Sequence, residues 1–257
     1  MADPMRLDGR CVMVTGAGQG IGRAIAERAL ALGASVALVD LNGSGLAEIE
    51  RAHGSDRVLT IAGSVADEAF VDEAMARTLG RFGALDGLVN NAGIVRAAMI
   101  EKMTLEQWQL VIDVNLTGVF LCLRAAGRVF LDQVRSGKRD GASIVNISSD
   151  AGRKGTIGQI NYGAAKAGVI GITMSAAREW ARFGIRVNST CYGVVETEMT
   201  ETVRSDKFRD RYLASIPTGR FLSPAEAAHS VCFLLSDAAV QITGQQLSVN
   251  GGSFVSA

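Results

Sequence analysis

The chain has 257 residues, and its 26 Lys and Arg balance 26 Asp and Glu, which leaves no basic excess to neutralise a nucleic acid. The 2 histidines and 4 cysteines show no zinc-site spacing, so we expect neither a protein-bound metal nor a disulfide framework. The 30 glycines exceed the average usage of roughly 7%. The backbone must therefore turn tightly or approach another backbone closely somewhere in the fold.

The N-terminal sequence MADPMRLDGRC has no apolar signal-peptide core, and no apolar run approaches the roughly 18 residues of a membrane span. We therefore expect a soluble cytoplasmic protein with no membrane partner. No linker-like composition, internal repeat or low-complexity tract divides the chain. This continuity predicts a single domain over residues 1–257.

Short apolar, β-branched runs alternate with longer segments of helical spacing along the chain, as in stacked βαβ units. We expect strands at 11–15, 35–40, 57–62, 85–90, 143–147, 185–189 and 246–249. We expect helices at 21–32, 44–52, 66–82, a long segment capped by Thr104, 161–182 and 224–235. Nearly continuous apolar strands indicate burial on both faces. The pattern predicts an α/β fold with a Rossmann-type, doubly wound parallel sheet of seven strands and helices on both faces.

A glycine-rich turn, TGAGQGIG at 15–22, lies between the first expected strand and the first expected helix. Such a turn brings backbone N–H groups and the positive end of a helix dipole to a diphosphate. Gly16, Gly20 and Gly22 would serve the turn, the close approach and the packing of helix on strand. The strict G-x-G-x-x-G spacing is not met, because Ile21 occupies its last position. A tight turn without a ligand remains the alternative.

Asp40 ends the second expected strand, where an acidic side chain can accept hydrogen bonds from both hydroxyls of an adenosine ribose. Its carboxylate would repel a 2′-phosphate. Neither Gln19 nor Leu41 offers a basic group to offset that repulsion. We therefore expect NAD rather than NADP, with a strand-end Asp that caps a turn as the alternative.

Tyr162 and Lys166 are one helical turn apart, so their side chains project from the same face of an expected helix. A neighbouring ammonium stabilises a phenolate, which predicts a lowered pKa for Tyr162. Tyr162 would then exchange a proton with an alcohol while a nicotinamide carries the hydride. Ser149 lies just past an apolar strand and would hold the substrate oxygen, whereas Ser148 would face elsewhere by strand alternation.

Taken together, these motifs resemble the short-chain dehydrogenase/reductase family in order and spacing, from about residue 7 to residue 254. The matching features are TGxxxGIG at 15–22, NNAG at 90–93, Asn115, Ser149, Tyr162 and Lys166, then TGQ at 243–245 and NGG at 250–252. The resemblance implies that Tyr162 is the general acid/base, that Lys166 binds the nicotinamide ribose and that Ser149 orients the reacting oxygen. It implies that Asn115 holds a water of a proton relay, with an Asn bonding within a kinked helix as the alternative.

The resemblance also implies which residues contact the cofactor. They are Gly16, Gln19, Gly20, Ile21, Gly22, Asp40, Ser64, Val65, Asn91, Ala92, Gly93, Tyr162, Lys166, Val195 and Thr197. Asn91, Ala92 and Gly93 would line the adenosine side, and Val195 and Thr197 would contact the nicotinamide amide. Ser64 stands where the family usually has an Asp that bonds the adenine amino group, so we expect a weaker contact there.

The subgroup that the chain most resembles reduces 3-oxoacyl thioesters. We therefore expect an NAD(H)-dependent oxidoreductase that interconverts a secondary alcohol and a ketone, with a 3-hydroxyacyl/3-oxoacyl thioester as the leading substrate. A cyclic, sugar-derived or steroid-like alcohol is the alternative substrate, and a non-catalytic dinucleotide-binding regulator is the alternative from another class. Three departures weaken the carrier-protein assignment: Tyr192 replaces the family's Pro, Phe183 replaces a carrier-docking Arg, and residues 135–142 lengthen one connection.

A substrate lid is expected near residues 196–217. The candidate substrate residues are Ser149, Asp150, Tyr192 and Met199. Tyr192 would either reshape the pocket or fill a gap beside the cofactor, and Asp150 would face either the pocket or solvent. Family resemblance further implies a homotetramer that pairs through the helices near 104–135 and 161–182.

Overall fold

A seven-stranded, wholly parallel sheet forms the centre of the protein, with strand order β3-β2-β1-β4-β5-β6-β7. The computed structural model describes residues 3–255. The strands are β1 (Cys11–Thr15), β2 (Ser35–Asp40), β3 (Val58–Ala62), β4 (Gly87–Asn90), β5 (Ala142–Ser149), β6 (Ile185–Tyr192) and β7 (Gln246–Val249). The chain reverses its direction of winding between β1 and β4, and ligands of such sheets bind at this switch point beside the carboxyl ends of the strands.

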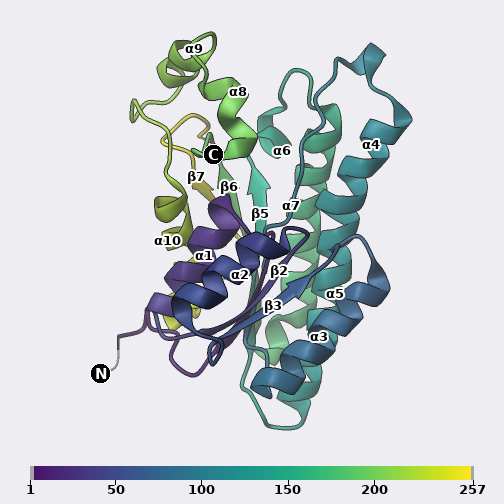
Figure 1. Ribbon diagram of the computed structural model, residues 1–257, viewed down its shortest axis with the longest axis vertical. Helices are drawn as coiled ribbons and strands as arrows, with labels where there is room; N and C mark the ends of the chain where they lie inside the picture. The colour runs from purple at the N-terminus through teal and green to yellow at the C-terminus, as the bar shows by residue number, and fades with distance from the viewer. Residues whose placement is uncertain (1–2, 256–257) are drawn as a thin grey trace.

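Helices cover both faces of the sheet, as Figure 1 shows. One layer contains α1 (Gly20–Ala31), α2 (Gly43–His53) and α10 (Pro224–Leu235), and the other contains α3 (Glu68–Phe82), α5 (Gly118–Arg135) and α7 (Ile160–Trp180). Side chains of β1 alternate between the two cores, with Val12 and Val14 in the first and Met13 in the second. Burial on both faces explains the continuous apolar strands, and the predicted fold class is confirmed.

Strands β5 and β6 are longer than the sequence predicts. Their pairing continues to Ser149 opposite Tyr192, past the expected strand ends at Ile147 and Ser189. The apolar pattern stops early because Ser148 and Thr190 are polar, yet both are buried. The extension carries Ser149 to the carboxyl edge of the sheet.

The long helical stretch Leu105–Arg135 is divided into α4 (Leu105–Ile112), a π-helical turn (Asp113–Thr117) and α5. Thr104 caps α4 as predicted, because its hydroxyl accepts from the Gln107 N–H at 3.1 Å. By length and composition alone, this stretch is long and apolar enough to cross a membrane. The expectation that no segment of the chain reaches that length and apolarity was therefore wrong. Of its most apolar window, 56% is buried inside the protein, as is typical of a core helix.

The segment expected to form the substrate lid contains several short helices. These are a 3-10 turn at Glu198–Thr200, α8 (Glu201–Arg204) and α9 (Arg209–Ala214). They lie beyond the carboxyl end of β6, at the top of the molecule in Figure 1. A further short helix, α6 (Ala151–Lys154), follows β5 at the same edge.

Candidate active site

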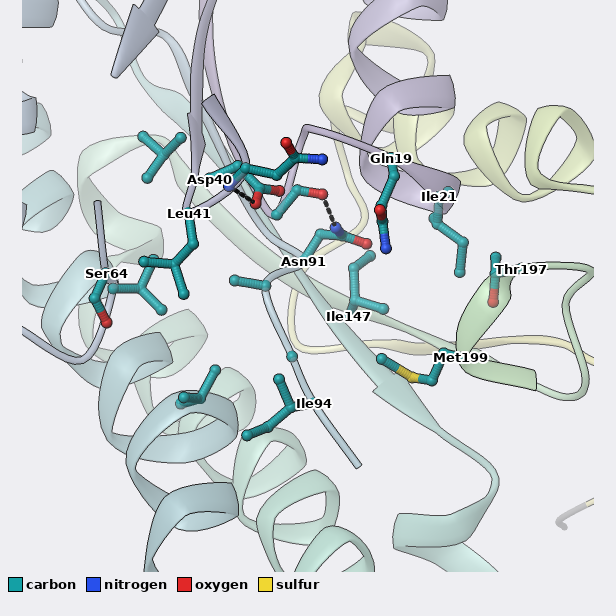
Figure 2. A pocket seen from close by; sticks show the side chains of 18 of the residues that line it. Gln19, Ile21, Asp40, Leu41, Ser64, Asn91, Ile94, Ile147, Thr197 and Met199 are labelled. Atoms are coloured by element: carbon teal, nitrogen blue, oxygen red, sulfur yellow. Dashed lines mark hydrogen bonds between the residues drawn. The ribbon is translucent and has the colours of Figure 1, made fainter. Parts of the chain in front are cut away.

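A pocket of about 570 Å³ lies at the carboxyl ends of the central strands. It is lined by these expected cofactor residues: Gly16, Gln19, Gly20, Ile21, Asp40, Ser64, Val65, Asn91, Ala92, Gly93, Tyr162, Lys166 and Thr197. In Figure 2, Asp40 and Ser64 lie at one end, Thr197 and Met199 at the other, and Asn91 between them. Residues from six separate parts of the sequence thus converge at the switch point.

The glycine turn leaves no space for side chains on its inner side. Gly16 has a φ of 64°, and a Cβ added there would lie 2.8 Å from the Cα of Ala92. A Cβ on Gly22 would lie 2.0 Å from the Gly16 carbonyl oxygen. Asn91 fastens the turn, because its Nδ2 donates to the Gly16 carbonyl at 3.0 Å. Gly22 is therefore a packing residue outside the pocket, whereas Gly16 shapes the pocket wall.

Asp40 both lines the pocket and stabilises the glycine turn. Its Oδ2 accepts from the Gly18 N–H and its Oδ1 from the Asn42 N–H, each at 2.8 Å. The two sequence interpretations of Asp40, ribose binding and turn capping, are therefore compatible in one side chain. The carboxylate gives this end of the pocket a negative charge that disfavours a phosphate on the ribose.

Ser64 lines the same end of the pocket, next to Val65. Its hydroxyl accepts from the Ala66 N–H at 3.2 Å. The hydroxyl oxygen can still accept one further hydrogen bond through its second lone pair, but it cannot offer the charged contact of a carboxylate. The expected weaker hold on an adenine amino group fits this geometry.

Tyr162 and Lys166 lie on α7 and face the pocket together. The Nζ of Lys166 donates to the Ile147 carbonyl at 2.7 Å and lies 5.5 Å from the centre of the Tyr162 ring. Burial lowers the pKa of Lys166 to about 8 and raises the pKa of Tyr162 to about 12, against a smaller opposing effect of a hydrogen bond to Ser149. The expected lowering of the Tyr162 pKa is thus wrong for this structure, because desolvation of the phenolate outweighs stabilisation by its neighbours.

Ser149 occupies the last position of β5, beside Tyr162. Its Oγ lies 3.5 Å from the Tyr192 carbonyl and accepts from the Ala151 N–H at 3.2 Å. Ser148 points to the other side of the strand, where its hydroxyl donates to the Lys166 carbonyl at 2.9 Å. The predicted alternation of the two serines is confirmed.

Asn115 lies fully buried in the π-helical turn between α4 and α5. Its Oδ1 accepts from the Ile94 N–H at 2.8 Å and its Nδ2 donates to the Ile94 carbonyl at 2.9 Å. The side chain therefore anchors the loop that follows β4.

Comparison with known proteins identifies the family. The profile described as enoyl-(acyl carrier protein) reductase matches residues 16–253. The chain is 41% identical over 250 residues to a 3-oxoacyl-[acyl-carrier-protein] reductase of Synechocystis sp., covering 96% of this chain and 97% of that protein. It belongs to the short-chain dehydrogenase/reductase family. It is therefore an oxidoreductase that acts on CH–OH groups with a nicotinamide dinucleotide.

Further relatives agree with this assignment. The 3-oxoacyl-[acyl-carrier-protein] reductase FabG of Escherichia coli is 40% identical over 254 residues, covering 98% of this chain and 100% of that one. Among solved structures, levodione reductase superimposes with a TM-score of 0.90 at 35% identity and covers 96% of this chain and 98% of its own. A Brucella melitensis protein titled short-chain dehydrogenase/reductase SDR:Glucose/ribitol dehydrogenase gives 0.90 at 34% identity, covering 97% and 98%.

In this short-chain dehydrogenase/reductase, Tyr192 does not line the pocket, contrary to one expectation. The side chain is buried against α10, where its hydroxyl donates to the Ala227 carbonyl at 2.8 Å and lies 3.3 Å from the Ser230 Oγ. Residues of one strand point alternately to opposite faces, and Tyr192 points into the core on the α10 side. The phenol therefore fills space under a helix and does not reshape the substrate region.

Asp150 is also absent from the pocket wall, and it is not solvated either. Its carboxylate accepts from the Asn250 Nδ2 at 2.9 Å and from the Ser253 hydroxyl at 2.8 Å. The C-terminal segment folds over the loop that follows β5 and covers this side chain. Asp150 thus fastens the C-terminal segment beside Ser149 and is not a substrate residue.

The lid segment rests on the glycine turn. The side chain of Val195 is buried outside the pocket, but Thr197 and Met199 line it. Gln19 Nε2 donates to Glu198 Oε2 at 3.0 Å, which joins the start of α1 to the lid. Any contact between Val195 and a nicotinamide amide would therefore involve its backbone.

Several pocket residues were missed from the sequence: Val39, Leu41, Asn42, Gly63, Ile94, Arg96, Leu110, Val114, Ile147 and Glu198. Ile94 and Arg96 follow NNAG at 90–93 at the carboxyl edge of β4, which is a signal that could have found them. Leu110 and Val114 look like ordinary core positions of a helix. Within residues 3–255, no group of three His, Cys, Asp or Glu side chains is arranged to hold a metal ion.

Proposed function

We propose that this enzyme is an NAD(H)-dependent 3-hydroxyacyl/3-oxoacyl thioester oxidoreductase. The observation that carries the proposal is that Tyr162 and Lys166 line one pocket beside the glycine turn, with the Ser149 hydroxyl, just outside the pocket lining, hydrogen-bonded to Tyr162. The thioester substrate is supported by relatives named 3-oxoacyl-[acyl-carrier-protein] reductase, which are 40% to 43% identical over nearly the whole chain. The catalytic site, substrate lid and cofactor pocket would all lie within one domain of 257 residues.

The proposed mechanism assigns one task to each catalytic residue. Ser149 Oγ donates to the substrate carbonyl oxygen, and Tyr162 Oη delivers the proton that converts the developing alkoxide into an alcohol. The Lys166 ammonium, held by the Ile147 carbonyl, stabilises the phenolate that remains. The nicotinamide, when bound, supplies or accepts the hydride. A water held by Asn115 would return a proton from solvent.

The pocket fits a dinucleotide because its glycine turn leads into the N-terminus of α1, whose first backbone N–H groups can bind a diphosphate. Gly16, Gln19, Gly20 and Ile21 would hold the diphosphate, with Gly22 supporting the turn from behind. Asp40 would bind the ribose hydroxyls and so select NAD. The adenosine end would be completed by Ser64, Val65, Asn91, Ala92 and Gly93, and the nicotinamide end by Tyr162, Lys166, Val195 and Thr197.

A substrate panel with wild-type enzyme and the Tyr162→Phe variant tests the proposal. We expect NADH oxidation with acetoacetyl-CoA, a lower rate with NADPH, and a loss of about 10²- to 10⁴-fold in kcat in the variant. NADH binding, followed by fluorescence, should stay within about threefold because the ring is retained. Unchanged turnover in the variant would overturn the mechanism.

The same panel distinguishes the alternatives. Turnover restricted to cyclic ketones or polyols would move the substrate to that class. NADH binding without turnover of any compound would favour the non-catalytic regulator. A clear preference for NADPH would contradict the role given to Asp40.

We further propose a cytoplasmic homotetramer, as the family resemblance implies. Apolar side chains remain exposed on the two long helical segments, among them Leu105, Phe120 and Met174. Pairing of these helices with a second copy would bury that surface.

A further inference from the structure

Arg96 is a charged pocket residue to which the proposed mechanism gives no task. It lies on the loop between β4 and α4, and it lines the pocket together with Ile94, Leu110 and Met199. The residue is exposed, so its guanidinium is accessible from the open side of the pocket. A cation beside an apolar wall can recognise a molecule that has an anionic end and a hydrocarbon part.

The backbone of Arg96 is fixed against the helix that carries the catalytic tyrosine. Asn161 Nδ2 donates to the Arg96 carbonyl at 3.0 Å and to the Gln107 carbonyl at 3.1 Å. Asn161 directly precedes Tyr162, so the loop is tied to the N-terminal turn of α7. The Ala98 N–H also donates to the Gly158 carbonyl at 2.9 Å. Arg96 thus projects from an anchored loop near the reacting centre.

The charges around the pocket leave the Arg96 guanidinium available for a ligand. Within residues 3–255, no carboxylate forms an ion pair with Arg96. The Nη1 of its guanidinium donates a hydrogen bond to the neighbouring Val95 carbonyl at 2.9 Å. The acidic pocket residues have other partners: Asp40 bonds the glycine turn, and Glu198 bonds Gln19. Lys166, the other cation, is buried on the Ile147 carbonyl.

We propose that Arg96 binds an anionic group of the substrate, a carboxylate or a phosphate, while Ile94, Leu110 and Met199 contact its hydrocarbon part. The planar guanidinium has five N–H donors and can hold either oxyanion with two parallel hydrogen bonds. This inference rests on the proposed function and specifies which end of the acyl substrate the enzyme recognises. A free 3-oxo acid offers the carboxylate, and a phosphopantetheine or CoA thioester offers the phosphate.

Steady-state kinetics with three substrates test the assignment in the variants Arg96→Leu and Arg96→Lys. The matched control is Arg51→Leu, which removes an exposed arginine on α2. The substrates are acetoacetate, acetoacetyl-CoA and the neutral ethyl acetoacetate. In Arg96→Leu we expect KM to rise about 10- to 100-fold for at least one anionic substrate, as the loss of a charge-assisted pair predicts. KM for the ester should change less than about twofold. The rise in KM for Arg96→Lys should be intermediate, because lysine keeps the positive charge but cannot form the two parallel hydrogen bonds of a guanidinium.

The pattern of losses distinguishes the two sources. A rise for acetoacetate alone indicates a carboxylate, and a rise for acetoacetyl-CoA alone indicates a phosphate. Equal losses with all three substrates, or no loss with either anion, would overturn the role of Arg96. Thermal unfolding of each variant separates a folding defect from a binding defect, and Arg96→Lys supplies the folded comparison.

Direct binding keeps this test separate from the proposed function. If the wild type turns over none of the three substrates, the proposed function fails. Calorimetric titration of acetoacetate and of CoA into NADH-loaded protein then decides the role of Arg96. Weaker binding of either anion to Arg96→Leu than to wild type supports the assignment, and equal or absent binding contradicts it.

Discussion

At the scale of single residues, burial determines the protonation of the catalytic pair. Tyr162 and Lys166 lie side by side in the pocket, and desolvation favours the neutral form of each. The phenol therefore retains its proton until a charge develops on the substrate oxygen. The lysine is the group of the pair that titrates near neutral pH, and its titration is linked to folding.

Lys166 should make stability depend on pH in a predictable direction. Its pKa is about 8 in the folded protein against an ordinary value of 10.5, so the unfolded chain binds more protons between these values. The free energy of unfolding therefore rises with pH across that range, and Lys166 destabilises most below it. Relative to Lys166→Met, the wild type should gain about 2 kcal/mol between about pH 8 and about pH 10. Urea unfolding of both proteins measures this gain.

A surface lysine provides the control for that measurement. Lys102 is exposed, so Lys102→Met should show no comparable change with pH relative to the wild type. Comparing each variant with the wild type cancels the other titrating groups. If the difference in the free energy of unfolding between the wild type and Lys166→Met stays constant across this pH range, the burial of an ionisable Lys166 is contradicted.

At the scale of elements, β6 and α10 are joined by Tyr192. Tyr192→Phe should lower the free energy of unfolding by about 1 kcal/mol, because the hydrogen bond to the Ala227 carbonyl is lost while the ring stays packed. KM values for substrate and cofactor should stay within about twofold. Chemical unfolding and steady-state kinetics check the two halves of this prediction. A changed KM with an unchanged free energy of unfolding would contradict this placement and indicate that Tyr192 contacts the substrate region.

The elements also separate what a local pattern predicts from what it misses. The Thr104 cap, strands β1 and β2 and helix α10 follow directly from propensity and apolar period. The π-helical turn at Asp113–Thr117 does not, because apolar spacing of threes and fours continues through it. Its position depends on Ile94, which bonds Asn115 from a distant loop.

At the scale of the whole molecule, exposed apolar helix faces predict assembly. Light scattering should give about four times the chain mass of 27.0 kDa. Phe120 on α5 is 44% exposed, and Phe120→Glu should lower the assembled mass by placing a charge in a helix interface. Val240→Glu, at a 63% exposed site outside those helices, is the matched control. A wild-type mass near that of one chain would contradict the proposed assembly.

The sequence by itself determined the class of fold and the chemistry-bearing motifs, because alternating apolar runs, a glycine turn and a Tyr-Lys pair are local patterns. Only the tertiary structure decided where side chains at the edge of the sheet point and how strongly each is desolvated. Asp150 and Tyr192 are adjacent to the site in sequence or register, yet both are bonded away from the pocket. Arg96 carries no motif of its own, but the packing of its loop against α7 brings it to the pocket. Orientation and burial depend on contacts between segments far apart in the chain, and those contacts exist only once the sheet is assembled.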